Sequence, residues 1–187
     1  MFAPSVRAAL SFRCKPGMKR TFEILNEMAT DGAIENYAIA GAIGAIFYVE
    51  PFATQDIDVL IVMPETDRGL VTEMPGWDYL RRRGYSEIRN GAIVVEGWPL
   101  QFIPVSNALE KEAYLNAEVL AFEEIPVRIV LAEHLVAIML NVGRPKDFAR
   151  IQMFLSQDAV DLQSLLDIVK RHGLTEKWEA FQAGFSS

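Results

Sequence analysis

Two aspartates two positions apart, Asp56 and Asp58, make the clearest chemical demand in this sequence of 187 residues. The apolar and β-branched residues between and after them, up to Val62, predict a strand, and strand side chains alternate between the two faces. Both carboxylates therefore point the same way, with Cα atoms roughly 6 to 7 Å apart. Burying such a pair without a partner is costly, so solvent or a cation should meet it. A hard divalent ion such as Mg²⁺ prefers these oxygen ligands and leaves its other positions to water or phosphate oxygens.

The segment just upstream supplies a second chemical element. The apolar run Tyr37 to Ala40 predicts a buried strand that stops at Gly41, and residues 42–49 predict a helix of about two turns that Pro51 ends. The free backbone N–H groups at a helix N-terminus can receive a phosphate. Together the two elements predict a metal-assisted nucleotide site. The alternative is that the aspartates are a solvated strand end and that Gly41 and Gly44 only allow close helix packing.

The spacing of these residues resembles the signature of the DNA polymerase β-like nucleotidyltransferase superfamily, Gly-[Gly/Ser] followed later by Asp-x-Asp. Here Gly41-Ala42 is followed by Thr54 and then by Asp56-Ile57-Asp58. Within the superfamily the sequence is most similar to small prokaryotic nucleotidyltransferase-like proteins, which include toxin components of abortive-infection toxin and antitoxin pairs. Those proteins also carry a C-terminal Gly-Arg-x-Lys-Asp motif, and residues 143–147 read Gly-Arg-Pro-Lys-Asp. The resemblance extends from about residue 20 to residue 175.

This resemblance implies an α+β fold with a mixed sheet of four or five strands flanked by helices, and a helical C-terminal half from about residue 132. The implied reaction transfers a nucleoside monophosphate from an NTP to an acceptor hydroxyl, with Mg²⁺ or Mn²⁺ as cofactor. RNA, protein and small molecules all stay open as acceptors, and a cognate protein partner of the toxin and antitoxin type is also implied. The resemblance implies that Asp56 and Asp58 are the catalytic and metal-binding residues. It implies that the nucleotide-binding residues are Gly41, Ala42, Thr54, Arg144 and Lys146.

Five positions depart from the family pattern, one of them Gly44, where the family often has Ala. Ala42 replaces a Gly or Ser, Phe52 replaces an Arg, and Met139 replaces a Lys of the C-terminal helix. The third acid of the family is expected within the segment Pro99 to Pro104, where this chain has Gln101; Glu96 is a weaker substitute because it lies at a turn. Nucleotide binding tolerates these changes more readily than catalysis does. A catalytically weak nucleotide-binding component of a toxin and antitoxin pair is therefore the alternative function.

Composition narrows the remaining classes of protein. The net charge of −7 argues against duplex DNA as a partner, because binding DNA requires clustered cations. The sequence has no run of 18 apolar residues, so a membrane helix is not expected. The expected location is cytoplasmic. A P-loop motif is absent, and the two histidines, His134 and His172, do not have zinc-site spacing. An EF-hand and an Asp-x-Asp-x-Thr phosphatase do not match, whereas a glycosyltransferase that holds a sugar nucleotide through Asp-x-Asp stays open.

The elements that must position the site follow from hydrophobic periodicity. Residues 1–17 are expected to be an extension, and 18–187 the domain, because helical spacing begins only near Thr21. Residues 92–96 and 100–103 predict a hairpin, which would turn Gln101 toward the aspartates if its strand neighbours theirs. The three arginines 81–83 are expected to end a helix in solvent rather than bind phosphate. Helices are predicted at 21–30, 67–83, 106–120, 132–141, 148–155, 158–171 and 174–184, and a further strand at 126–131.

Overall fold

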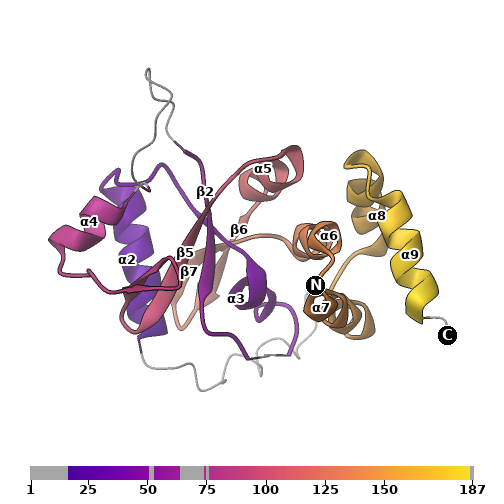
Figure 1. Cartoon of the computed structure of the whole chain (residues 1–187), viewed down its shortest axis with the longest axis horizontal. Helices are drawn as coiled ribbons and strands as arrows, with labels where there is room; N and C mark the ends of the chain where they lie inside the picture. The colour runs from indigo at the N-terminus through magenta and orange to yellow at the C-terminus, as the bar shows by residue number, and fades with distance from the viewer. Residues whose placement is uncertain (1–16, 51–52, 64–73, 75, 186–187) are drawn as a thin grey trace.

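A single mixed sheet organises the chain in the computed structural model, which describes residues 17–50, 53–63, 74 and 76–185. Within these ranges the sheet has seven strands in the order β3-β4-β5-β2-β1-β7-β6, with helices on both faces (Figure 1). The strands are β1 (Ala38–Ile39), β2 (Ile57–Ile61), β3 (Ile88–Arg89), β4 (Ala92–Val95), β5 (Trp98–Pro104), β6 (Glu118–Phe122) and β7 (Ile125–Ile129). The helices are α2 (Met18–Thr30), α3 (Gly41–Ala45), α4 (Trp77–Arg82), α5 (Ala108–Leu115), α6 (Ala132–Val142), α7 (Pro145–Ser156), α8 (Leu162–Arg171) and α9 (Thr175–Phe185).

The central strand β2 is antiparallel to β1 on one side and parallel to β5 on the other. β1 in turn runs parallel to β7, while the β3–β4, β4–β5 and β6–β7 pairs are antiparallel. The predicted α+β class, with a mixed sheet flanked by helices and a helical C-terminal half, is confirmed. The predicted number of four or five strands is wrong, since the sheet has seven.

The extra strands were missed because their turns or lengths give little signal. The turn between β6 and β7 is Glu123-Glu124, with φ angles of 44° and 71°. Tight hairpin turns of this kind favour Gly and Asn, so two glutamates do not predict one. As a result the end of the segment 106–120, expected to be helical, is instead the start of β6. β3 has only two residues, too few to show alternation, although the Asn90-Gly91 turn after it is a typical hairpin signal.

The hairpin predicted at residues 92–103 is present as β4 and β5, but its turn is tighter than expected. Only Glu96 and Gly97 form the turn, with φ angles of 51° and 85°. Trp98 and Pro99, predicted to belong to the connection, pair with Val95 and Val94 and extend β5. A two-residue turn with both φ angles positive keeps the twist of the flanking strands, so pairing can begin at once.

Alternation along β2 divides the interior into two cores. Ile57 and Val59 pack into the core that α2 and α4 cover, whereas Leu60 packs into the core formed with α5 and the C-terminal helices. Figure 1 shows α2 and α4 on one side of the sheet, and α3 and α5 to α9 on the other. Full burial of each large aliphatic side chain stabilises the fold by roughly 1.5–3 kcal/mol. Asp58 lies between Ile57 and Val59 and so faces the C-terminal helical half.

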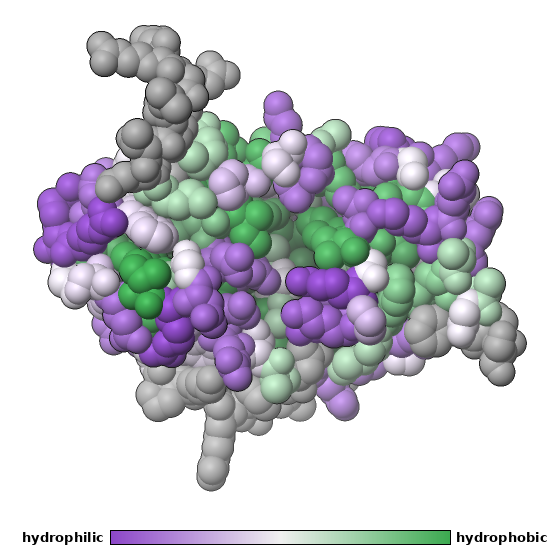
Figure 2. Space-filling view, in the orientation of Figure 1, coloured by the Kyte–Doolittle hydropathy of each residue, from purple (hydrophilic) through white to green (hydrophobic). Residues whose placement is uncertain are grey.

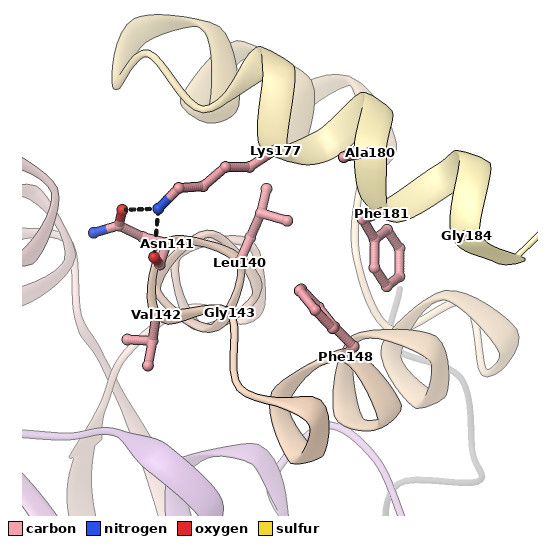
Figure 3. Close-up of a pocket in the computed structure, with 9 residues that line it drawn as sticks. All are labelled: Leu140, Asn141, Val142, Gly143, Phe148, Lys177, Ala180, Phe181 and Gly184. Atoms are coloured by element: carbon pink, nitrogen blue, oxygen red, sulfur yellow. Dashed lines mark hydrogen bonds between the residues drawn. The ribbon is translucent and has the colours of Figure 1, made fainter.

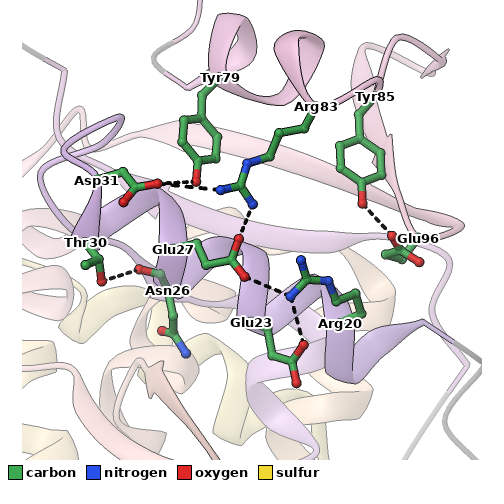
Figure 4. A network of polar contacts seen from close by, with 10 residues as sticks. All are labelled: Arg20, Glu23, Asn26, Glu27, Thr30, Asp31, Tyr79, Arg83, Tyr85 and Glu96. Atoms are coloured by element: carbon green, nitrogen blue, oxygen red, sulfur yellow. Dashed lines mark hydrogen bonds and ion pairs between the residues drawn. The ribbon is translucent and has the colours of Figure 1, made fainter.

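A polar network holds α4 against α2 on the opposite face (Figure 4). Arg83, the last of the three consecutive arginines, pairs with Glu27 and lies 3.6 Å from Asp31, while its guanidinium stacks 4.4 Å from the ring of Tyr79. The Tyr79 hydroxyl donates to Asp31 at 2.7 Å. Exposed ion pairs contribute little stability, so this network mainly orients α4. Residues 64–73, where the helix 67–83 was predicted to begin, lie outside the described residues.

The start of the domain agrees with the first described helix. α2 begins at Met18, which is buried, and the carbonyl of Gly17 accepts hydrogen bonds from the backbone and hydroxyl of Thr21 at 2.9 and 3.0 Å. Residues 1–16 of the expected extension lie outside the described residues, so the boundary at residue 18 stays a proposal. In the described ranges no helix is both long enough and apolar enough to cross a membrane.

Glu112 on α5 joins three helices of the C-terminal half. Its carboxylate accepts from Arg171 Nη2 at 2.5 Å, and it lies 2.7 Å from His172 Nε2 and 3.2 Å from His134 Nε2. The hydrogen bond with Arg171 is the main reason that the pKa of Glu112 falls to about 2, and the two histidines lower it further. Both histidines therefore serve a structural junction, in agreement with the absence of zinc spacing in the sequence.

We predict that Glu112→Gln destabilises the protein in a pH-dependent way. Because the folded-state pKa lies below the ordinary value of 4.5, the carboxylate contributes its full stability above about pH 4.5 and loses it as the pH falls toward 2. Half-exposed Arg171 screens the pairing, so the loss at pH 7 should be about 1–2 kcal/mol. Urea unfolding at pH 7, 5 and 3.5 should show the difference from the wild type shrinking at the lowest pH. The exposed Glu179→Gln is the control, and an equal loss at every pH would contradict the prediction.

Candidate functional site

The side chain of Asp58 lies close against the backbone of Gly41. Gly41 has a φ of +56°, and a Cβ atom added there would lie 1.8 Å from Asp58 Oδ2 and 2.7 Å from its Cγ. The neighbouring Ala40 N–H donates to the Asp58 carbonyl at 2.9 Å, which holds the turn in place. Only glycine fits this position, both for its φ angle and for the space. α3 follows directly and ends at Ala45, so it is shorter than the predicted 42–49 helix.

The carboxylate of Asp58 is partly buried and poorly compensated. Burial raises its pKa most, and the charge of Asp56 raises it further, while Arg144, Arg150 and Lys146 act in the opposite direction. From the described part of the chain, no hydrogen bond reaches the Asp58 carboxylate. The two aspartates thus repel each other in a partly desolvated place, which is the electrostatic setting that a divalent cation relieves.

Asp56 lies just before β2 and is exposed. The hydroxyl of Thr54 lies 3.1 Å from Asp56 Oδ1 and 3.2 Å from the Asp56 carbonyl, and as a donor it fixes the orientation of the carboxylate. Thr54 is thus positioned beside Asp56, and its expected contact with a nucleotide stays a prediction.

The first turn of α7 brings cations to the aspartates. Asp147 is fully buried, and its carboxylate accepts three hydrogen bonds from Arg144. The donors are Nε at 2.7 Å, Nη2 at 3.1 Å and the backbone N–H at 3.3 Å. Arg150 Nη1 lies 3.8 Å from Asp147 Oδ1. Asp147 therefore caps its helix. It also holds Arg144 and Arg150 in place, and the pKa of Arg144 is raised first by Asp147 and then by Asp58 and Asp56. Arg144 and Lys146 thus share one electrostatic field with the aspartate pair.

Arg150 was missed in the sequence. It lies four residues after Lys146 and three after Asp147, so it shares their face of α7. That spacing was the available signal, although only the fold shows that this face turns toward Asp58. The side chain of Arg150 is largely buried, with an exposed fraction of 16%.

Gln101 lies directly opposite Asp58 on the neighbouring parallel strand. The expectation that its strand neighbours the aspartate strand, with both side chains on one face, is confirmed. In the described ranges no group of three or more His, Cys, Asp or Glu side chains is arranged to hold a metal. The two carboxylates with the amide oxygen of Gln101 fit one hard cation whose other ligands are water and phosphate oxygens. A second ion would lack a carboxylate.

Ala42, Met139 and Glu96 were also singled out in the sequence. Ala42 is buried in α3, and Met139 is buried in the core of the helical half. Glu96, the weaker substitute for the third acid, accepts from the Tyr85 hydroxyl at 2.5 Å at the β4–β5 turn. Phe52 lies outside the described residues.

The larger of two pockets found in the described part of the chain is not at the aspartates. It has a volume of about 510 Å³ and lies between the end of α6, the start of α7, and α9 (Figure 3). Its walls include Val142, Phe148 and Phe181, and Lys177 crosses it to the carbonyl and side chain of Asn141 at 2.5 and 2.9 Å. Lys177 thus satisfies a carbonyl at the end of α6, which makes this pocket a feature of helix packing.

The smaller pocket, of about 170 Å³, includes Asp56 and Gln101 and is mostly polar. Figure 2 shows hydrophilic side chains gathered on either side of a hollow near the middle of this face. The chemistry of the lining, rather than volume, marks the smaller pocket as part of the site.

Comparison with solved structures agrees with this fold. A crystal structure of an antigenic nucleotidyltransferase-like protein from Paracoccidioides brasiliensis superposes with a TM-score of 0.52 at 17% sequence identity, covering 88% of this chain and 93% of that one. The structure of ANT(2″)-Ia in complex with adenylyl-2″-tobramycin gives a TM-score of 0.47 at 15% identity, covering 89% and 97%. No family model and no curated protein matches the sequence. The first comparison shows that the chain has a nucleotidyltransferase-like fold.

We predict that Gly41→Ala costs more stability than Gly32→Ala. Both glycines have positive φ angles, +56° and +72°, so both substitutions strain the backbone by about 1 kcal/mol or more. Nothing lies within 4 Å of a Cβ at Gly32, whereas a Cβ at Gly41 overlaps the Asp58 carboxylate. That overlap should add about 1–3 kcal/mol. Urea unfolding of both variants measures the difference, and equal losses would show that the Asp58 side chain moves away at no cost.

Proposed function

We propose that the protein is a nucleotidyltransferase that transfers a nucleoside monophosphate from an NTP to an acceptor hydroxyl. One observation carries this proposal: the Asp56 and Asp58 pair shares an electrostatic field with the cations of α7 that Asp147 holds. A carboxylate pair and a cationic helix turn are the two parts needed to hold a metal ion and a triphosphate side by side. The nucleotidyltransferase-like fold supports the same reading.

Asp56 and Asp58 would hold Mg²⁺ or Mn²⁺, which when bound neutralises charge on the phosphoryl group that is transferred. Thr54 orients Asp56, and the missing side chain of Gly41 leaves room beside Asp58. Arg144, with Lys146 and Arg150, would bind the phosphate oxygens.

In the reaction, the acceptor oxygen forms a bond to the α-phosphorus while the bond from that phosphorus to the bridging oxygen of the β-phosphate breaks and pyrophosphate leaves. The proton of the acceptor hydroxyl has to leave as well. Gln101 is an amide and cannot accept it at neutral pH, so another group, a carboxylate of the pair or water, would have to take the proton.

Gln101 also favours a second candidate function, that of a catalytically weak nucleotide-binding protein. Opposite Asp58, a neutral amide provides a ligand oxygen but neither the charge nor the basicity of a third carboxylate. Such a protein would bind the metal and the NTP and act through a cognate partner, as in a toxin and antitoxin pair. A cytoplasmic location suits both candidates, since both need nucleotides.

We predict that Asp56→Asn and Asp58→Asn each weaken metal-dependent NTP binding by about tenfold or more, which corresponds to at least ~1.4 kcal/mol. Isothermal titration of the four non-hydrolysable NTP analogues with and without Mg²⁺ measures this. Asp58→Asn should also leave the apo protein as stable as before or more so, because burial and Asp56 both disfavour its charge. Asp167→Asn on α8 is the control. Unchanged affinity in both variants would show that the aspartates are only a solvated strand end.

We predict that Gln101→Asp strengthens binding of a second metal ion and raises any transferase activity. The substitution supplies a third carboxylate opposite Asp58, at some cost in apo stability from clustered charge. Gln101→Asn is the matched control, because the Asn side chain has the same length as Asp but carries no charge. Metal stoichiometry from titration and label transfer from an α-labelled NTP are the two measurements. If Gln101→Asp folds and changes neither, position 101 does not serve the metal site.

A further inference from the structure

The smaller pocket adjoins the aspartates on the side of the hairpins. The start of β2 supplies Gln55 and Asp56, the β3–β4 turn supplies Arg89 and Asn90, and β5 supplies Gln101. The two-residue turns after β3 and β4 bring these walls together, because each reverses the chain in the least possible length. The pocket is therefore built by the sheet itself and begins directly beside the metal-binding pair.

The pocket and the α7 cations lie on different sides of β2. Figure 1 shows α7 on one side of β2 and the β3–β4–β5 hairpins on the other. Arg144, Lys146 and Arg150 do not line the pocket. If the triphosphate occupies the α7 side, as the proposed function requires, the hairpin side is left for the acceptor.

The size of the pocket limits what can enter. A volume of about 170 Å³ is below the roughly 300–1,000 Å³ typical of sites for drug-sized ligands. It accommodates one sugar ring or a group of similar size.

The lining also selects by charge. Three amides, those of Gln55, Asn90 and Gln101, offer donors and acceptors for hydroxyl groups. Among the described lining residues Asp56 is the single carboxylate, and the proposed metal ion would use its charge. Arg89 adds a cation. It pairs with Glu87 at 2.6 Å, but both side chains are more than half exposed, so another anion can readily replace Glu87. The lining thus offers Arg89 as a cationic partner for an anionic substituent, and Asp56 is its one carboxylate among the described residues.

We propose that this pocket is the acceptor subsite and that the acceptor is a small, sugar-sized hydroxyl compound carrying an anionic group such as a phosphate. Arg89 would bind the anionic group and the three amides would orient the ring, with the reacting hydroxyl toward Asp56. The proposal rests on the proposed function, because it assigns the second substrate of the same site.

Three probes with one ring and different charges test the assignment: glucose 6-phosphate, glucose and glucosamine. NMR titration of the full chain, with Mg²⁺ and a non-hydrolysable ATP analogue present, should show glucose 6-phosphate binding about tenfold more tightly than glucose, with glucosamine weakest. Arg89→Gln should remove the advantage of the phosphate and leave glucose unchanged. Arg82→Gln, an exposed arginine on α4 outside the pocket, should change nothing.

The outcomes separate this proposal from the function on which it rests. The acceptor assignment is wrong if the three probes bind equally, if glucosamine binds best, or if no probe binds. The nucleotidyltransferase proposal still stands in these cases, provided that nucleotide binding depends on Asp56 and Asp58. Transfer of label to RNA or to a protein instead of to the sugar phosphate overturns the assignment in the same way. If metal-dependent nucleotide binding itself is missing, both proposals fail.

Discussion

The contact between the Gly41 backbone and the Asp58 carboxylate is the constraint on which the rest of the site depends. A glycine with positive φ lets the β1–α3 turn lie against the carboxylate, and the Ala40 hydrogen bond to the Asp58 carbonyl keeps it there. The turn covers part of the carboxylate, which is one source of the burial that raises its pKa. The partly buried charge of Asp58 lies next to that of Asp56 and requires compensation. Arg144, Arg150 and Lys146 supply it.

Compensation comes from α7, and Asp147 is what makes it possible. A fully buried carboxylate at the third position of a helix can satisfy the N-terminal backbone and at the same time hold two arginines. Because Asp147 holds Arg144 and Arg150 lies close by, the charges of both arginines act on Asp58. Placing the cations nearby but engaged elsewhere suits a site that must accept both a metal ion and an anion.

The sheet brings the parts together from distant stretches of sequence. β5 lies beside β2 in parallel, so Gln101 is level with Asp58, and α6 and α7 pack on the same face through the second core. The hairpins that precede β5 stay on the opposite side of β2 from α7. The aspartates consequently lie between a cationic helix and a polar pocket, which is a natural division between two substrates of unlike charge and size.

The sequence by itself determined what local chemistry decides. Alternation placed Asp56 and Asp58 together at a strand, and glycine and proline marked the turn before it. The β4–β5 hairpin was also predictable, because it depends on a spacing within a short segment. The α+β class was implied by the resemblance of the motifs to a known family, and Gln101 was expected to face the aspartates only if its strand neighbours theirs.

Only the tertiary structure decided the rest. The β6–β7 hairpin turns at two glutamates, whose positive φ angles are imposed by strand pairing rather than by their own preference. Arg150 and Arg89 look like ordinary surface residues until the fold shows which face of α7 and which hairpin turn they occupy. The division of β2 into two cores, with Asp58 directed at one of them, is likewise a property of helices packed on both faces. Such long-range contacts depend on which elements meet, and one-dimensional patterns do not contain that information.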